Sequence, residues 1–214
     1  MPGNRVLKIK RRVNQESDIK RVVVSRLPTR YGLFDIYGYE SGSGGLEQVA
    51  LVFGKLPLAS PALVRIHSEC LTGEVFGSLR CDCQPQLELA LETIAANGSG
   101  AVVYMRGHEG RGIGLVNKLR AYALQDLGHN TVRANRELGL PVDARDYAAA
   151  VAILHDLGVT KLRLMTNNPD KVRAVEAAGI EVTERVPLVT ASTVDNEDYL
   201  RTKQEELGHL FGSK

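Results

Sequence analysis

Alternating apolar and polar positions near the start of the chain predict a β-rich first half. Three such runs occupy residues 22–40, 46–54 and 62–68, and clusters of Gly and Ser separate them. Apolar runs of this kind bounded by turn-forming residues are typical of strands. We therefore expect strands in each of the three ranges.

Helical periodicity begins after residue 83. The apolar positions that recur at the spacing of one helix face are Leu87, Leu91 and Ile94. Asn97-Gly98 closes this segment, and the apolar run 100–106 predicts a short buried strand. A glycine-rich segment, GHEGRGIG, then leads into a second helix that stops near Gly128. Its apolar face comprises Val116, Leu119, Ala123 and Leu127.

The last third of the chain alternates between helix and strand patterns. Asp143 is well placed to cap a helix whose inward stripe is Tyr147, Val151 and Leu154. A strand follows at 161–166, and Asn168 with Pro169 predicts the start of a helix that ends at Gly179. A further strand at 180–186 and a terminal helix at 195–210 complete the pattern.

These patterns predict an α/β fold with a mixed (α+β) sheet, in which a β-rich N-terminal half precedes alternating helices and strands. No repeat, low-complexity segment or clear linker divides the sequence. We expect one compact domain over residues 23–214, preceded by a basic, mobile or loosely docked arm over residues 1–22.

Composition favours an ordinary globular protein. The 214 residues are 43% hydrophobic, enough for a substantial core, and no apolar run is long enough to cross a bilayer or to resemble a secretory signal. We therefore expect a cytoplasmic protein without membrane contact. The net charge is only +2, and the basic excess lies in residues 1–22, since the remainder of the chain carries 20 basic and 23 acidic residues, which argues against nucleic-acid binding.

All three cysteines of the chain lie in CLTGEVFGSLRCDC, as Cys70, Cys81 and Cys83. A reducing compartment and an odd number of cysteines both argue against structural disulfides. Zinc binding is the favoured interpretation, and reactive thiols or buried apolar cysteines are the alternatives. Three ligands leave the fourth zinc position to water, as in catalytic sites, unless His67 completes the set. Such a water loses a proton near neutral pH, which suggests hydrolysis, with Glu69 and His67 placed to orient it or relay protons.

The glycine-rich segment is less specific. GHEGRGIG lacks the Lys-Ser/Thr ending of a P-loop and does not follow the dinucleotide-binding spacing. By itself it is more typical of a strand-to-helix turn than of a phosphate site.

An ordered set of longer segments resembles GTP cyclohydrolase II, the family that begins riboflavin synthesis. These segments, which span roughly residues 25–210, are SRLPTRYG, RIHSECLTGEVFGSLRCDCQPQLE, RGHEGRGIGL, NKLRAYALQDLG, VDARDY, LMTNNPDK, ERVPL and YLRTKQEELGHL. The resemblance implies a homodimer that opens the imidazole ring of GTP and releases formate and pyrophosphate. The product would be a diaminopyrimidinone carrying a ribosylamino phosphate.

The resemblance also implies roles for individual residues. It places one Zn²⁺ per subunit on Cys70, Cys81 and Cys83 with a water, and Mg²⁺ on the triphosphate. Asp143 would be the proton acceptor, Arg145 the nucleophile, and Tyr122 part of the ring-opening site. The implied GTP contacts are Arg65, Ile66, His67, Ser68, Glu69, Gln86, Glu109, Gly110, Arg111, Thr131, Thr166 and Lys171.

The chemistry of these residues suits GTP, with one point open. Arg65, Arg111 and Lys171 supply positive charge for a triphosphate, and the Tyr122 hydroxyl can donate to or accept from the opening ring. Because arginine stays protonated, Arg145 could equally stabilise the departing pyrophosphate as a cation. Two other hypotheses are a sister enzyme that retains the formyl group or feeds another pathway, and a zinc- or nucleotide-binding module without catalysis.

Overall fold

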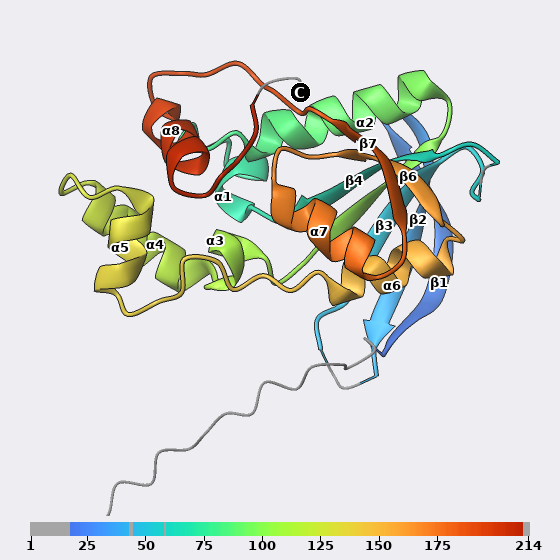
Figure 1. Ribbon diagram of the computed structural model, residues 1–214, viewed down its shortest axis with the longest axis horizontal. Helices are drawn as coiled ribbons and strands as arrows, with labels where there is room; N and C mark the ends of the chain where they lie inside the picture. Colours follow the sequence, from blue (N-terminus) through green and yellow to red (C-terminus); the bar gives the residue numbers. More distant parts are fainter. Residues whose placement is uncertain (1–17, 43–44, 58, 212–214) are drawn as a thin grey trace, which may run out of the picture.

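The computed structural model describes residues 18–42, 45–57 and 59–211, and these residues contain one mixed seven-stranded sheet (Figure 1). The strands are β1 (Ile19–Thr29), β2 (Gly32–Ser41), β3 (Gln48–Phe53), β4 (Ala62–Ser68), β5 (Gly100–Met105), β6 (Lys161–Met165) and β7 (Glu181–Val186). They pair in the order β1-β2-β3-β5-β4-β6-β7. The pairs from β1 to β5 are antiparallel, and the pairs from β5 to β7 are parallel.

The antiparallel part confirms the β-rich N-terminal half. The first predicted run divides into β1 and β2 at a tight turn, where the Thr29 hydroxyl donates to the carbonyl of Gly32 at 2.8 Å. Strand β1 begins at Ile19, so the last residues of the predicted basic arm belong to the sheet. Residues 1–17 of that arm lie outside the described residues.

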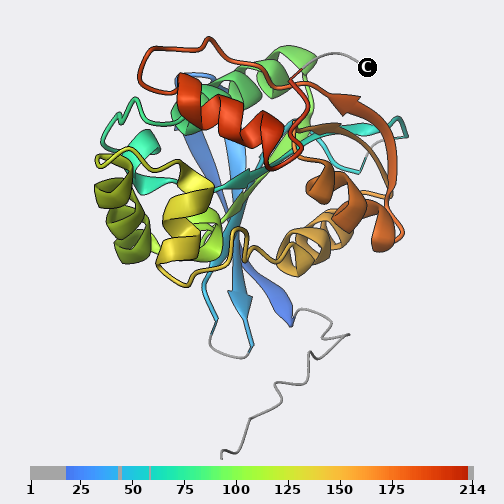
Figure 2. The same cartoon turned by 60° about the vertical axis from the view of Figure 1, so that its left-hand side comes forward.

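Helices cover both faces of the parallel part. On one face, α6 (Ala148–Asp156) and α7 (Pro169–Ala177) pack over a core that includes Val64 and Val103. On the other, α2 (Cys83–Asn97) packs over a core that includes Leu63 and Val102 (Figure 2). Successive residues of β4 and β5 therefore face different buried layers, which explains why residues 62–64 of β4 and 101–103 of β5 are apolar without alternation. The α/β fold class is confirmed.

Two predicted helix boundaries are confirmed by their capping geometry. The side chain of Asn168 accepts a hydrogen bond from the N–H of Asp170 at 2.9 Å, and Pro169 is the first residue of α7. Helix α2 ends at Gly98, whose φ of 78° lies in the left-handed region that favours glycine.

The remaining helices lie beyond the carboxyl ends of the parallel strands (Figure 1). They are α1 (Leu71–Glu74), α3 (Glu109–Gly112), α4 (Leu115–Gln125), α5 (Thr131–Glu137) and α8 (Glu197–Glu205). The sequence patterns did not predict α5. No helix in the described ranges has both the length and the apolar character that a membrane crossing requires.

The predicted cap at Asp143 is wrong. Helix α6 begins at Ala148, and the N–H of that residue donates to the carboxylate of Asp146 at 2.8 Å. The carboxylate of Asp143 instead accepts from the backbone N–H and the guanidinium of Arg145. The Asp143 carboxylate is thus held by Arg145 in the loop before the helix, and Asp146 accepts the bond from the first N–H of α6 instead. The inward stripe of the helix is retained, since Tyr147 and Leu154 are buried.

The apolar face of α4 points outward. Val116 and Leu119 are exposed, whereas Lys118 and Ala121 are the buried residues of this helix. The apolar spacing therefore predicted the helix but not the side of it that packs on the protein.

Candidate functional site

A cavity lies at the edge of the sheet where the parallel strands β4, β5 and β6 end. It encloses about 1050 Å³ of space that no atom fills, including its open mouth. Ligands of open α/β sheets bind at this carboxyl edge, because the loops after neighbouring strands meet there.

Nearly all of the residues singled out in the sequence line this cavity. They are Arg65, His67, Ser68, Glu69, Cys70, Cys81, Cys83, Gln86, Glu109, Gly110, Arg111, Tyr122, Thr131, Arg145, Thr166 and Lys171. Two predicted residues are absent from its lining. The Ile66 side chain packs in the core, and only its carbonyl takes part, as the acceptor for Lys171 Nζ at 2.8 Å. Asp143 lies behind the lining and pairs with Arg145.

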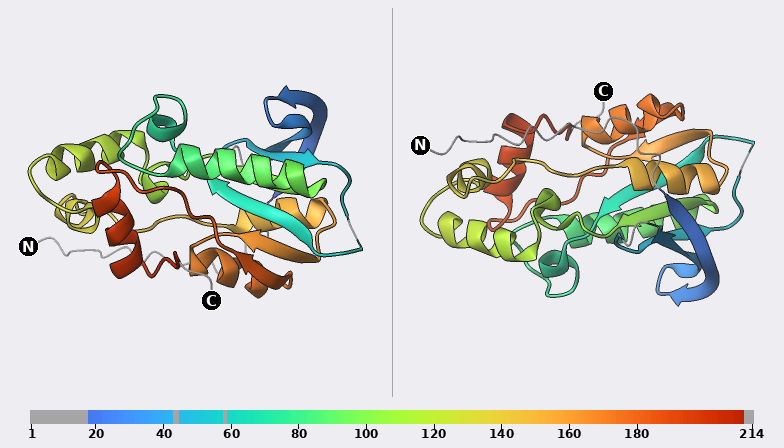
Figure 3. Two further views of the ribbon diagram at one scale, coloured as in Figure 1. Left: turned by 90° about the horizontal axis from the view of Figure 1, so that it is seen from above. Right: turned by 90° about the horizontal axis from the view of Figure 1, so that it is seen from below.

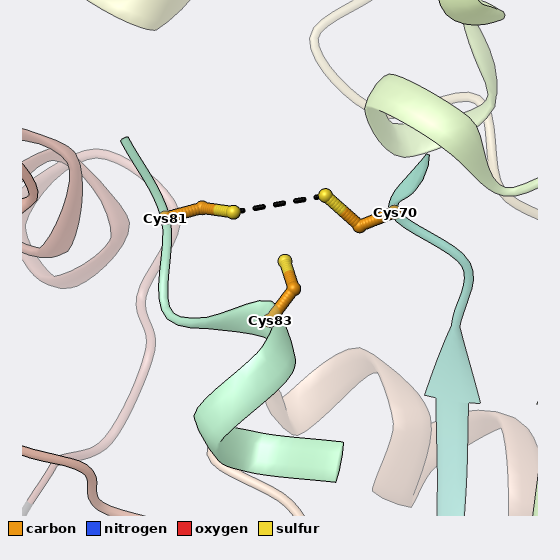
Figure 4. A group of neighbouring side chains, drawn as sticks. All are labelled: Cys70, Cys81 and Cys83. Carbon is orange, nitrogen blue, oxygen red and sulfur yellow. Dashed lines mark hydrogen bonds between the residues drawn. The ribbon is translucent and has the colours of Figure 1, made fainter. Parts of the chain in front are cut away.

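The three cysteine sulfur atoms point toward one another (Figure 4). Their Sγ atoms all lie within 4.8 Å of each other, and those of Cys70 and Cys81 are 3.6 Å apart. Cys70 follows β4, whereas Cys81 precedes α2 and Cys83 is its first residue. No other group of three His, Cys, Asp or Glu side chains in the described ranges is close enough to hold a metal ion. The donor set is soft and compact, and it fits zinc.

Gly73 leaves the space that this cluster occupies. A Cβ atom at this position would lie 2.9 Å from Cys81 Sγ and 3.3 Å from Cys70 Sγ. Any other residue would therefore have to displace the sulfur atoms.

His67 is not part of the cysteine cluster. Its Nε2 lies 2.9 Å from Glu74 Oε1, and the other carboxylate oxygen of Glu74 accepts from the Tyr104 hydroxyl at 2.6 Å. Burial lowers the pKa of His67 to about 4, although the hydrogen bond to Glu74 opposes this shift. The imidazole is therefore neutral at physiological pH and is held in the wall of the cavity.

Lys118 is a site residue that the sequence analysis missed. Its Nζ donates to Cys70 Sγ at 3.0 Å, to Thr72 Oγ1 at 2.8 Å and to Glu109 Oε1 at 2.5 Å. Burial alone would lower the pKa of Lys118, but the Cys70 thiolate and Glu109 raise it above its ordinary value. The ammonium group thus offsets negative charge at the cluster.

Tyr122 lies one helical turn after Lys118, on the same side of α4. Its hydroxyl is 3.4 Å from Thr72 Oγ1, and the Arg80 guanidinium lies 4.8 Å from the centre of its ring. Burial raises the pKa of Tyr122, so the hydroxyl keeps its proton and can donate it. The i, i+4 spacing of Lys118 and Tyr122 is the signal that could have predicted that both face the site.

The glycine-rich segment supports the loop that carries Asp143 and Arg145. Gly110 and Arg111 have φ of 59° and 64°, and the Arg111 carbonyl accepts from the N–H of Ala144 at 2.9 Å. Arginine rarely adopts positive φ, so the packing around this turn imposes the conformation. A Cβ at Gly112 would lie 3.0 Å from the carbonyl carbon of Ala144, which shows how closely the two segments approach.

Asp143 and Arg145 form a bidentate ion pair. Arg145 Nε donates to Asp143 Oδ1 at 3.0 Å, and its NH2 group donates to Oδ2 at 2.5 Å. Burial opposes the charge on each residue, but the pairing lowers the pKa of Asp143 and raises that of Arg145. The pair is therefore held in its ionised form.

His108 is a second residue that the sequence analysis did not single out. Its Nε2 lies 2.9 Å from the carbonyl oxygen of Asp146, so Nε2 donates and Nδ1 accepts from the Ser68 hydroxyl at 3.1 Å. Burial lowers the pKa of His108 to about 4. The ring links the end of β4 to the loop before α6.

Several other predicted contacts are already hydrogen-bonded within the protein. The Glu69 carboxylate accepts from the N–H of Gly107 at 2.5 Å, and Glu109 accepts from the N–H of Leu71 at 2.7 Å. The Thr166 hydroxyl accepts from the N–H of Asn168 at 3.0 Å, and that of Thr131 accepts from Gln125 at 3.3 Å. These bonds hold the loops of the cavity in place.

Positive charge dominates the cavity. Its cationic lining residues are Arg65, Arg80, Arg111, Lys118, Arg145, Lys171 and Lys203, whereas Glu69 and Glu109 are its carboxylates. Such a lining favours a multiply charged anion.

Comparison with known proteins decides the family. The family model described as GTP cyclohydrolase II matches residues 20–187. The chain belongs to the GTP cyclohydrolase II family. The matched range contains the cysteine cluster, the glycine-rich segment and the Asp143–Arg145 pair, and it ends before α8.

Curated relatives of this GTP cyclohydrolase II family chain are riboflavin biosynthesis proteins. The protein RibBA of Salinispora tropica is 57% identical over 92% of this chain and 49% of its own length. RibBA of Aquifex aeolicus is 53% identical over 95% of this chain and 50% of its own length. A monofunctional chloroplastic protein of Arabidopsis thaliana, RIBA 3, is 52% identical over 95% of this chain and 40% of its own length. The chain thus spans about half the length of these relatives or less.

Among solved structures, a two-domain 3,4-dihydroxy-2-butanone 4-phosphate synthase from A. baumannii, RibBX, has a TM-score of 0.46 and 20% identity. The match covers 83% of this chain and 42% of that one. A similarity at this level supports no conclusion about function.

Replacing Gly73 should weaken metal binding without altering any ligand. In Gly73→Ala the new methyl group would press on two of the three sulfur atoms, so we expect zinc affinity to fall by about tenfold or more. Val75→Ala, at an exposed position directly after the same helix, α1, is the control. Chelator competition measures both variants, and wild-type affinity in Gly73→Ala would contradict this view of the cluster.

Acid should destabilise the metal-free protein between pH 6.5 and about 4. His67 and His108 have pKa values of about 4 in the folded protein, below the ordinary value of 6.5. Below pH 6.5 the unfolded chain therefore binds protons that the folded protein does not. The stabilisation is complete above pH 6.5 and is lost as the pH falls, on the order of 2–3 kcal/mol for each residue.

Urea unfolding at a series of pH values measures this dependence. His108→Gln should flatten it, whereas His155→Gln, at an exposed position, should leave it unchanged. Equal slopes in wild type and His108→Gln would show that His108 does not titrate as described.

Proposed function

We propose that the cavity binds GTP and opens its imidazole ring by hydrolysis, with release of formate and pyrophosphate. The product would be a diaminopyrimidinone carrying a ribosylamino phosphate, and the step would begin riboflavin synthesis. One observation carries this proposal. A compact three-cysteine cluster and an excess of cations line the same cavity, and ring opening and triphosphate binding need these two features.

The cysteine cluster supports the ring-opening half of the reaction. Cys70, Cys81 and Cys83 would hold zinc. When bound, zinc supplies Lewis acidity and water activated near neutral pH, as hydrolysis at guanine C8 requires. The side chains around it would handle protons and charge. Tyr122 can donate its proton to the opening ring, and Lys118 offsets the negative charge of Cys70.

The cations support the triphosphate half. Arg111 of α3, Arg145 of the loop before α6 and Lys171 of α7 all line the cavity, a suitable arrangement for several phosphate oxygens. Mg²⁺ would accompany the triphosphate, held mainly by phosphate oxygens and water, which is consistent with the small number of carboxylates in the lining.

The ion pair supports a clamp role for Arg145 in preference to that of a nucleophile. Pairing with Asp143 strengthens the hold of the guanidinium on its protons, so its nitrogen lone pairs are poorly available for attack on phosphorus. The same pairing lowers the basicity of Asp143. We propose that Arg145 stabilises the negative charge that develops on the departing pyrophosphate and that Asp143 fixes its orientation.

Two alternatives are less well supported. A closed structural zinc site needs four protein ligands, but only the three cysteines gather in the part of the chain that the structure describes. A sister activity that retains the formyl group would not need a proton-donating hydroxyl beside the cluster, yet Tyr122 lies there.

We further propose that the protein forms a homodimer through an apolar surface beside the site. The surface is made by α4 and the segment after α1, which lie side by side (Figure 3) and are joined by the Arg80–Asp126 ion pair. Its exposed side chains are Val75, Phe76, Leu79, Val116, Leu119 and Leu127. Apolar groups concentrated in this way are typical of interaction surfaces. The three free cysteines suit a reducing compartment, which supports the cytoplasm as the place of action.

Incubation with GTP and Mg²⁺ tests the activity directly. Zinc-loaded protein should release formate and pyrophosphate, and mass spectrometry should find a product without a formyl group. Arg145→Met should lower kcat by about 100-fold, and Arg145→Lys should lower it less because it keeps the positive charge. Absence of both released products would refute the function, and a guanylyl adduct on rapidly quenched wild-type protein would refute the clamp.

A charge placed in the apolar surface should break the dimer. Leu119→Asp would bury a carboxylate in the interface, so we expect a dimer of the wild type and a monomer of the variant in sedimentation velocity. Val194→Asp carries the same change at a position that is 95% exposed on another part of the surface, and it should remain dimeric. A dimeric Leu119→Asp variant would place the interface elsewhere.

A further inference from the structure

Helix α8 closes one side of the cavity. In Figure 2 this helix, drawn in red, lies between α2 and α5, and it packs against α5. Tyr199 and Lys203 of α8 and His209 after it line the cavity. The N–H of Leu210 donates to the carbonyl of Asn167 at 2.8 Å, which ties the end of this segment to the loop after β6.

The central contact of α8 is a buried ion pair with the segment that carries Cys81 and Cys83. Lys203 Nζ lies 2.6 Å from Asp82 Oδ1, and the two residues are only 8% and 1% exposed. The same Nζ lies 4.4 Å from the centre of the Tyr199 ring. Asp82 stands between Cys81 and Cys83. Through this ion pair, Lys203 contacts the turn that carries two of the three cysteine sulfur atoms.

The carboxylate of Asp82 does not cap helix α2, although its position in the sequence would suggest that it does. Asp82 is the N-cap residue of α2, where an aspartate usually accepts from the first free backbone N–H groups. Its side chain makes no such bond. One oxygen accepts from Lys203, and the other accepts from Gln86 Nε2 at 2.5 Å.

The pairing of Asp82 with Lys203 affects how the two neighbouring cysteines are oriented. For Cys81 and Cys83 to direct their sulfur atoms into one space, the residue between them has to turn the other way. Lys203 supplies the buried partner on that other side. Without it the Asp82 carboxylate would be left buried and uncompensated, and it would turn toward water or toward the N-terminus of α2.

The contact also extends to the substrate side of the cavity. Gln86 Oε1 accepts from Arg65 NH2 at 2.7 Å, and Arg65 NH1 donates to the carbonyl of Met165 at 3.0 Å. A continuous chain of buried hydrogen bonds therefore runs from α8 through Asp82 and Gln86 to the end of β6. Gln86 and Arg65 are two of the proposed GTP contacts.

We propose that Lys203 is a positioning residue, which holds Asp82 so that the Cys81–Cys83 turn and Gln86 are both set for metal and substrate binding. The C-terminal helix is then a working part of the site, although it lies outside the range that the family model matches. The substrate side of this inference rests on the proposed function, whereas the metal side does not.

Three single variants test the proposal. Lys203→Met removes the charge but keeps most of the side-chain volume, Lys203→Arg keeps the charge, and Arg201→Met is a matched control at an exposed position on the same helix. We expect Lys203→Met to weaken zinc binding by about tenfold or more in chelator competition and to change the thiolate-to-metal absorption of the Co²⁺-loaded protein. Lys203→Arg should recover most of the loss, and Arg201→Met should match the wild type.

A role in stability alone predicts a different result. Folded Lys203→Met protein, verified by circular dichroism, would then bind zinc and Co²⁺ as the wild type does, and this outcome would overturn the proposal. If Lys203→Met does not fold, the double variant Lys203→Met with Asp82→Asn removes both charges and relieves the buried carboxylate. The double variant should fold yet bind zinc weakly, and wild-type affinity in it would also overturn the proposal.

The GTP readout separates this inference from the proposed function. If the wild type turns over GTP, Lys203→Met should raise KM through Gln86 and Arg65, in addition to its effect on metal binding. If the wild type does not act on GTP, the proposed function fails, but the zinc and Co²⁺ measurements still decide whether Lys203 positions the cluster.

Discussion

Parallel pairing of β4 with β5 on one side and β6 on the other brings the carboxyl ends of three strands to the same edge of the sheet. The loops that leave these ends carry Cys70, the glycine-rich segment and Thr166, which are far apart in the sequence. The pairing requires helices on both faces to bury the strands, and α2 starts at this same edge. Cys81 and Cys83 therefore meet Cys70 because α2 must begin where β4 ends.

The second constraint is the burial of positive charge. Arg65, Lys118, Lys171 and Lys203 are all buried, and each donates to an acceptor inside the protein. Lys118 and Lys203 have carboxylate partners, whereas Lys171 donates only to a backbone carbonyl. Burial and the nearby Arg65 and Arg145 hold the pKa of Lys171 well below its ordinary value. The triphosphate of the proposed substrate would counter this repulsion and favour the protonated form of Lys171.

Local patterns in the sequence predicted the features of the fold that depend on interactions between residues close together in the chain. The strands, the Asn168-Pro169 helix start and the glycine that ends α2 depend on neighbours in the chain. The cysteine cluster was predictable because all of its ligands lie in one short window. Contacts between distant segments were not predictable in this way. Asp143 does not cap α6, because the helix begins only at Ala148 and the Asp143 carboxylate pairs with Arg145, and the local sequence pattern predicted neither feature.

The sequence did not predict Lys118, Lys203 and His108 as site residues, and the reason is the same for all three. Lys118 sits on a helix whose apolar stripe suggested the opposite side as the buried one, and it is buried only because Cys70 and Glu109 offset its charge. Lys203 lies 121 positions from its partner Asp82, and His108 is held by Ser68 and Asp146, each in a different segment. Charged and polar residues of this kind are expected at the surface from sequence alone. Only the fold shows that partners from distant segments allow them to be buried.

The most direct test of the proposed function is a crystal structure of the zinc-loaded protein with Mg²⁺ and a GTP analogue that resists hydrolysis. We expect guanine C8 to face the Cys70–Cys81–Cys83 cluster, Gln86 and Arg65 to lie beside the bound nucleotide, and the α-phosphate to lie within reach of the Arg145 guanidinium. A nucleotide bound outside this cavity, or one with its triphosphate on the cysteine cluster and its base near Arg145, would contradict it.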